Sequence, residues 1–385
     1  PLSNEKEVSM QHLKNKLKRT TDEYVQKIKR DVRNNTPWGN LTPEELKGLK
    51  TLKERIKGEN IVIYQTDKSG RFSVDNIDNY REACNTHMQN DCDVTDEFHE
   101  KAQKVVNAHS IMWVRLLRAG EAVGGQDRIK RNMLVQDSTL APLYALRKDH
   151  KKYDCPVQGP PVRPVCGAAS AYNTRLSHLL SMILTEVWKE AESVCMNTEE
   201  MLVEFERLNR EEIREDIIIG SADVKALYQS LDIPFAIDKA CEIFYNSTIQ
   251  VAGVDTDELG LYLAVNKTEK QLEQLNIPRY CPTRRTKRGR PPTITGCAIN
   301  ECKRKRFAPW KIPEQEADEQ TIRKMLTEAM RIALLFIMQN HIYTYDNKTI
   351  LQSKGGPIGL QLTGILAQLF MIWWDKQLHT KLMNL

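Results

Sequence analysis

The sequence predicts an α+β fold, and three observations carry that prediction. Short β-branched runs at 60–76, 216–224 and 341–352 have the length and composition of strands. Long segments with apolar residues at helical spacing separate these runs, so strands and helices alternate irregularly along the chain. The composition, 41% hydrophobic and 28% charged over 385 residues, is typical of a globular protein with two or three structural units.

The first half of the chain opens with a basic helical arm at 1–57, in which Thr42-Pro43-Glu44-Glu45 forms a helix start. Residues 58–215 follow as a second unit. We expect two strands joined by the turn "DKSG", a helix over about 76–135, and a proline-rich extended stretch that becomes a helix near Ala171. A further helix is predicted near 198–210.

The second half begins with a predicted strand in "DIIIGSADV", within a unit at 216–249 that ends in a helix. Residues 250–315 have the character of a basic insertion. The unit at 316–385 is expected to hold a helix at 318–340, a hairpin around "DNK", a glycine-rich turn and a final apolar helix.

Charge and cysteine content indicate which partners and which cellular compartment to expect. The net charge is +5, but residues 283–311 carry ten Lys and Arg residues against Glu301 alone, a run that suits a polyphosphate partner or a solvated loop. Nine cysteines without paired short spacings fit a reducing compartment, so we expect an intracellular, nuclear location. No apolar run approaches the length of a membrane span, and no membrane partner is expected.

Two segments in the first half contain cations at positions where a phosphate could bind. The turn in "TDKSGRFSV" presents Lys68 and Arg71, and "LYALRKDHKK…GPPVRPVCGAAS" presents Lys148, Lys151 and Arg163. Cations on rigid extended segments suit the fixed, multi-donor binding that phosphate groups need. A plain charged hairpin tip explains the first segment equally well.

Two further segments follow in order. "SADVKALYQSLDIP" places Asp223 and Val224 after an apolar run and Tyr228 five residues after the aspartate. "YTYDNKTILQSKGGPIGLQLTG" holds Gln352, Gly355, Gly356 and Gly359 before the last helix. Asp at a strand end is also ordinary turn chemistry, and we interpret Asp232 as a structural carboxylate at a helix start or turn.

Taken in this order, the four segments at about 60–385 resemble the reverse transcriptases of Penelope-like retroelements. The resemblance implies right-hand polymerase fingers and part of a palm. It implies that Asp223 and the Val224 carbonyl hold catalytic metal, and that Tyr228 excludes a ribose 2′-hydroxyl. Lys68, Arg71, Lys148 and Arg163 would bind the triphosphate, Lys151 the nucleic acid, and Gln352 with the three glycines would lie near base and template. Ile358 and "LQLTG" depart from the family pattern, as does Arg147.

The function implied is an RNA-directed DNA polymerase that binds an RNA template, a DNA primer and a deoxynucleoside triphosphate, with two Mg²⁺ ions. The family's next element is a hairpin with two adjacent aspartates, which this sequence lacks. We therefore expect the sequence to be part of a longer protein, with the missing carboxylates supplied by further residues or a second chain. The alternative is a non-catalytic nucleic-acid-binding scaffold. An RNA-copying RNA polymerase is disfavoured, because the Tyr228 ring would collide with a ribose.

Other motifs leave further interpretations open. Lys287, Arg288 and Arg290 in "TKRGRPP" match an AT-hook core, and Lys303 and Arg304 begin a nuclear-import-like "KRKR"; unspecific nucleic-acid contact explains both sets. Three cysteines, with His341 as a distant fourth ligand, are spaced loosely for zinc: Cys281, Cys297 and Cys302. Trp373 and Trp374 are expected to serve helix packing rather than base stacking, and Asp375 is expected to have a helix-surface or packing role.

Overall fold

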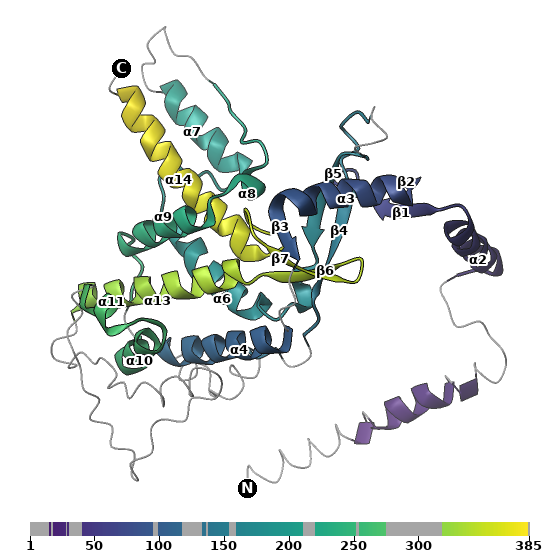
Figure 1. Cartoon of the computed structure of the whole chain (residues 1–385), viewed down its shortest axis with the longest axis horizontal. Helices are drawn as coiled ribbons and strands as arrows, with labels where there is room; N and C mark the ends of the chain where they lie inside the picture. The colour runs from purple at the N-terminus through teal and green to yellow at the C-terminus, as the bar shows by residue number, and fades with distance from the viewer. Residues whose placement is uncertain are drawn as a thin grey trace. The chain divides into compact units, whose positions relative to one another are not determined.

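The structure is a computed structural model that describes residues 15–16, 18–27, 29–30, 41–94, 99–117, 133–135, 138–153, 159–210, 220–251, 254–274 and 318–383. The chain divides into two compact units, one formed by Pro1–Ile63 with Val74–Ile77 and the other by Tyr64–Ser73 with Asp78–Leu385. Both helices and small sheets are present, as the α+β prediction requires (Figure 1). Within the described ranges, no helix combines the length and the apolar character needed to span a membrane.

The first unit is mainly helical. Described residues between 15 and 30 are helical, and α2 (Pro43–Gly58) follows. The α2 helix begins where predicted, because Thr42 and Glu45 form a capping box in which each side chain accepts a hydrogen bond from the other's backbone N–H. The two-stranded sheet of β1 (Ile61–Gln65) and β2 (Phe72–Asn76) confirms the predicted hairpin, whose turn and adjoining strand residues, Tyr64–Ser73, belong to the second unit.

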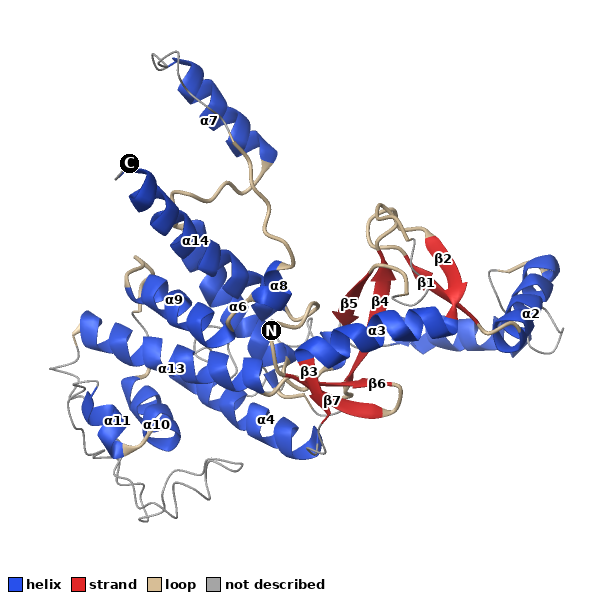
Figure 2. Cartoon of the chain, turned by 45° about the horizontal axis from the view of Figure 1, so that its top comes forward, coloured by secondary structure: helices blue, strands red, loops and turns tan. Residues whose placement is uncertain are grey.

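A five-stranded mixed sheet forms one part of the second unit. Its strand order is β3 (Cys92–Val94), β7 (Lys348–Gln352), β6 (Ile342–Tyr345), β4 (Ala141–Arg147), β5 (Val162–Cys166). The β4 and β6 strands are parallel, and all other neighbours are antiparallel. The predicted hairpin of β6 and β7 turns through Asp346 and Asn347, both with positive φ, a conformation that Asp and Asn tolerate well. Helix α3 (Ile77–Asp91) lies across the strands (Figure 2), and the Tyr80 hydroxyl accepts a hydrogen bond from the β4 backbone at Ala145.

The helices beside this sheet contain most of the core. They are α4 (His99–Leu116), α6 (Thr174–Lys189), α9 (Ile233–Tyr245), α10 (Thr256–Asn266), α13 (Glu319–Gln339) and α14 (Gln361–Met383), with the short η1 (Ala168–Ser170), α8 (Leu227–Ser230) and α11 (Glu269–Gln274) between them. Helix α13 packs on α9 and α10, while α14 packs on α6 and α9. Helix α7 (Thr198–Arg210), which was also predicted, has no buried residue.

Helical periodicity explains why these helices pack together. In α9 the buried residues recur three and four positions apart, which places them on one face: Ile233, Ala236, Ile237, Ala240, Cys241 and Phe244. Helix α13 repeats the pattern over more turns and buries ten residues. Burying such stripes supplies the main favourable free energy of the fold.

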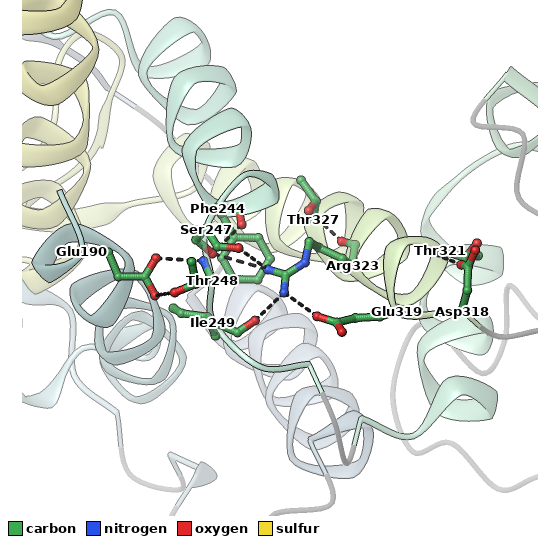
Figure 3. A network of polar contacts seen from close by, with 10 residues as sticks. All are labelled: Glu190, Phe244, Ser247, Thr248, Ile249, Asp318, Glu319, Thr321, Arg323 and Thr327. Carbon is green, nitrogen blue, oxygen red and sulfur yellow. Dashed lines mark hydrogen bonds and ion pairs between the residues drawn. The ribbon is translucent and has the colours of Figure 1, made fainter.

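An arginine fixes the connection between α9 and α10 to the core (Figure 3). The Arg323 guanidinium, from α13, donates to the carbonyl oxygens of Ser247 and Ile249 at 2.9 and 2.6 Å and pairs with Glu319. Glu190, after α6, accepts hydrogen bonds from the backbone and hydroxyl of Thr248. These contacts satisfy backbone groups that the loop would otherwise leave unpaired, so this buried arginine has a structural role.

Three sequence predictions differ from the structure. The helix predicted over 76–135 is interrupted by β3, because Cys92 pairs with Gln352 at the sheet edge and a long-range ladder overrides local helical preference. Of the strand predicted over 216–224, residues 216–219 lie outside the described residues, and only the described part, residues 220–224, is without a strand. The range 250–315 includes α10, whose Leu259 and Tyr262 are fully buried in the core, so this part of the range is integral to the fold.

Candidate nucleotide-binding site

The β1–β2 turn docks on the ends of β4 and β5. Thr66 forms a parallel bridge with Arg147, and the Asp67 backbone N–H donates to the Arg147 carbonyl at 2.7 Å. Just beyond β4, the Lys148 N–H donates to the Pro161 carbonyl at 2.8 Å. These backbone contacts join two segments that lie about eighty residues apart in sequence, and both carry predicted phosphate-binding cations.

The docking creates a basic cluster, defined here as Lys148, Lys151 and Arg163. Burial, followed by repulsion from Arg163, lowers the pKa of Lys148, and Lys151 adds to the repulsion. Asp67 opposes these effects, and its Oδ1 lies 3.0 Å from Arg163 Nη1. Cations held close together would gain stability from a bound anion.

Lys68 and Arg71 lie at the exposed turn of the hairpin. The turn itself is fixed by the Thr66 hydroxyl, which contacts the Ser69 hydroxyl and donates to the Arg71 carbonyl. Lys68 and Arg71 therefore lie on an ordered turn that adjoins Asp67, the partner of Arg163.

The predicted glycine-rich turn makes two close backbone contacts. Gly355 has a φ of +62°, and a Cβ at that position would lie 2.6 Å from the carbonyl oxygens of Tyr228 and Gln229. Gly359 has a φ of +113°, and a Cβ there would lie 2.1 Å from the Cys166 carbonyl oxygen. Only glycine fits both requirements, positive φ and no side chain.

Tyr228 is thereby held against the glycine-rich turn. Its carbonyl accepts a hydrogen bond from the Gly356 N–H at 2.8 Å, and its hydroxyl lies 3.8 Å from where a Cβ on Gly364 would be. The side chain is 36% exposed. Two residues earlier, Ala226 adopts a left-handed conformation, with φ of 54°, that sets the direction of the α8 turn.

Strand β5 connects the two groups of residues. Arg163 lies at one end of β5, and at the other end the Cys166 N–H donates to the Ile358 carbonyl at 2.7 Å. Three residues of strand span about 10 Å. Arg163 of the basic cluster and the Cys166 contact with the glycine-rich turn therefore lie at the two ends of one short strand.

A groove runs between α6 and α14 close to Tyr228. Its lining residues are His178, Ser181, Met182, Thr185, Glu186, Gln361, Gly364, Ile365 and Gln368. His178 and Gln361 are joined across it by a 2.6 Å contact between Nδ1 and Oε1. The groove combines polar side chains with exposed apolar surface, and Gly364 is shared with the Tyr228 contact.

Protein-family models, curated proteins and solved structures were compared with the chain, and none matched.

Gln352, predicted to lie near the base, is buried beside the glycine-rich turn. The residue is 5% exposed, and its Nε2 donates to the Lys354 carbonyl at 2.6 Å. The Tyr343 hydroxyl donates to its Oε1 at 3.4 Å. Gln352 therefore stabilises the glycine-rich turn, and its side-chain amide is hydrogen-bonded within the protein.

Asp223 and Val224 lie in the irregular segment before α8, and both are exposed. Across the portion of the chain that the structure describes, no group of three or more His, Cys, Asp and Glu side chains is arranged to hold a metal ion. Asp223 is thus a single exposed oxygen ligand close in sequence to Tyr228.

The remaining predicted residues fall into three groups. The basic residues Lys287, Arg288, Arg290, Lys303 and Arg304, and the three candidate zinc cysteines, lie outside the described residues. His341 is fully buried, with Nδ1 3.0 Å from Asn173 Nδ2, and is not positioned as a surface ligand. Asp232 caps α9 through a hydrogen bond from the Phe235 N–H, which confirms its structural role.

On the last helix, the predicted packing role is confirmed for Trp373 but not for Trp374. Trp373 packs edge-on against Phe235 and tilted against Phe370, whereas Trp374 is 41% exposed. Burial raises the pKa of Asp375. None of these side chains is close in sequence to the glycine-rich turn.

Sequence reasoning missed Asp67 and Cys166. Asp67 read as an ordinary turn residue beside Lys68, although an acidic residue before a basic turn is a signal of a paired charge. Cys166 contributes only its backbone, so nothing in its side chain could have identified it.

Proposed function

We propose that this chain forms the fingers and part of the palm of an RNA-directed DNA polymerase. It would bind an RNA template with a DNA primer and add deoxynucleotides by nucleotidyl transfer. The observation that carries the proposal is the arrangement along β5, with cations at one end and the Tyr228–glycine turn contact at the other.

That arrangement suits the two ends of a deoxynucleoside triphosphate. The triphosphate needs several fixed cationic donors, which Lys148, Lys151 and Arg163 offer. The sugar needs a shaped apolar contact, which the Tyr228 ring offers beside Gly364. Template and primer would follow the groove between α6 and α14.

The chemistry requires divalent metal, and its donors here fit only in part. Asp223 and the Val224 carbonyl are the hard oxygen ligands that Mg²⁺ prefers. When bound, Mg²⁺ would activate the primer 3′-hydroxyl and stabilise the leaving pyrophosphate. The second set of carboxylates is expected from residues outside this chain, so the role of the described residues is to bind and orient the nucleotide.

The first test measures nucleotide binding with Lys148→Gln. The chain would be bound to a fluorescent poly-rA/oligo-dT duplex with a dideoxy-terminated primer. Mg²⁺ and then dTTP would be added stepwise, and binding would be followed by the fluorescence anisotropy of the duplex. Because one charge-assisted contact is worth about 1.5–3 kcal/mol, we expect the dTTP affinity of Lys148→Gln to fall at least about tenfold. Its stability should be unchanged or higher, since Lys148 is repelled by Arg163.

Lys104→Gln is the matched control, because Lys104 is an exposed lysine on α4. It should bind dTTP like the unaltered chain. An equal dTTP affinity in both variants, or a duplex complex indifferent to dTTP, would contradict the proposal. Tyr228→Ala provides a second arm, in which discrimination between dTTP and UTP should decrease.

A non-catalytic nucleic-acid-binding scaffold is the second candidate. It is favoured because no group of three or more His, Cys, Asp and Glu side chains among the described residues is arranged to hold a metal ion. A scaffold would bind the duplex with salt-sensitive affinity that neither dTTP nor Lys148→Gln alters. The same anisotropy titration therefore separates the two functions.

A further inference from the structure

Asp67 is an almost completely buried carboxylate within the basic cluster. Its side chain is 2% exposed, whereas that of its partner Arg163 is 45% exposed. Oδ1 pairs with Arg163 Nη1, and the buried Oδ2 has no hydrogen-bond partner among the residues that the structure describes. Buried polar atoms are nearly always paired, so an unpaired carboxylate oxygen among cations calls for an explanation.

The fold leaves Asp67 little freedom to move. Its N–H is bonded to the β4 end at Arg147, and the preceding Thr66 is bridged to the same residue. Arg163 is anchored on β5, opposite Leu146. The negative charge is therefore fixed, while the outer edge of the Arg163 guanidinium, with several donors, faces solvent.

We propose that Asp67 is the counter-charge that limits the affinity of the basic cluster for phosphate groups. With Asp67 in place, the cluster holds a polyphosphate only while several cations are engaged, and it releases pyrophosphate readily. The inference deepens the proposed function and depends on it, because it assumes that Lys148, Lys151 and Arg163 bind the triphosphate.

Removing the Asp67 charge has two opposing effects on the affinity of the basic cluster for anions. Asp67 orients Arg163, and ordering a free arginine side chain would weaken anion binding by up to about tenfold. Asp67 also repels the anion. A unit charge about 6 Å away at an effective dielectric constant of about 20 corresponds to a factor of about 100. Repulsion is the larger effect, so removing the charge should tighten binding.

The experiment compares Asp67→Asn with the unaltered chain, using inorganic pyrophosphate as the probe in isothermal titration calorimetry. We expect the Kd of Asp67→Asn to fall about tenfold, with a steeper dependence on salt. Asp149→Asn is the matched control. It removes the same charge from the adjoining loop, but the Asp149 side chain is 28% exposed, so screening should keep its change within about twofold.

Unchanged pyrophosphate affinity in Asp67→Asn would overturn the inference and leave Asp67 a structural residue. Weaker affinity would overturn it in favour of an orienting role. If the unaltered chain binds no pyrophosphate, the phosphate role of the cluster fails, and with it the support for the proposed function. That result is distinct from a failure of Asp67 alone.

Folding of each variant would be checked by thermal unfolding. Asp67→Asn leaves a half-exposed guanidinium, which water can solvate, so the variant is expected to fold. If Asp67→Asn does not fold, the double variant Asp67→Asn/Arg163→Gln would be compared with the single variant Arg163→Gln. The pyrophosphate affinity of the two variants provides the same test. Removing the Asp67 charge must then tighten pyrophosphate binding by the two remaining lysines.

Discussion

At the residue scale, two glycines determine how closely the glycine-rich turn approaches its neighbours. Gly355 lies against the backbone of Tyr228 and Gln229, and Gly359 lies against Cys166. Both have positive φ, which an L side chain adopts only with strain. The position of Tyr228 relative to β5 therefore depends on residues that contribute no side-chain atoms.

Replacing Gly359 by alanine tests this dependence. The new Cβ would lie 2.1 Å from the Cys166 carbonyl oxygen, so we expect Gly359→Ala to lower the free energy of unfolding by more than about 3 kcal/mol. Gly220→Ala is the control, because nothing lies within 4 Å of a Cβ there, and its effect should stay within about 1 kcal/mol. Urea titration measures both, and similar values would show that the turn can relax.

At the scale of elements, short segments join the nucleotide-binding residues to the core. Helix α8 follows the left-handed Ala226 and contains Tyr228, and Asp232 caps α9 immediately afterwards. The apolar face of α9 then packs on α13 and α14. The α9 N-terminus therefore fixes where the α8 turn ends.

Asp232→Ala should remove the cap of α9. The Phe235 N–H would lose its acceptor, and we expect a loss of about 1 kcal/mol in the free energy of unfolding. Glu242→Ala, which removes an exposed i,i+3 pair with Lys239 on the same helix, should cost less than about 0.5 kcal/mol. Equal losses in thermal unfolding would mean that the cap contributes little here.

At the scale of the whole molecule, the core encloses two histidines in their neutral form. His109 contacts the Tyr262 hydroxyl at 2.7 Å and stacks on Phe336, and His341 lies beside Asn173. Burial lowers the pKa of each histidine to about 4. Protonating either one would place a charge among apolar side chains.

Stability should therefore fall as the pH falls. The unfolded chain binds a proton on each histidine below about pH 6.5, whereas the folded chain does so only near pH 4. Between these values protons favour the unfolded state, and each histidine contributes up to about 3 kcal/mol of lost stability. Urea unfolding at pH 7 and pH 5 measures the loss.

His109→Gln should flatten part of this pH dependence. His178→Gln, which replaces an exposed histidine, is the control. A stability that does not vary between pH 7 and pH 5 in the unaltered chain would contradict burial of neutral imidazole.

The sequence by itself determined the elements whose signals are local. The capping box at Thr42 and Glu45, the α9 and α13 stripes and the two hairpins follow from side chains close together in the chain. Gly355 and Gly359 were predicted to allow close approach to a base and template, whereas the neighbours that the structure places against them are the backbones of Tyr228, Gln229 and Cys166.

Only the tertiary structure decided which distant segments meet. β3 forms because Cys92 pairs with Gln352 in the sheet. Helix α10 is buried because it packs on α4 and α13. Asp67 is paired because Arg163 on β5 lies beside it. Long-range pairing and burial depend on partners that no sequence window contains. Backbone partners such as Cys166 leave no trace in side-chain chemistry at all, since any residue type could supply that carbonyl.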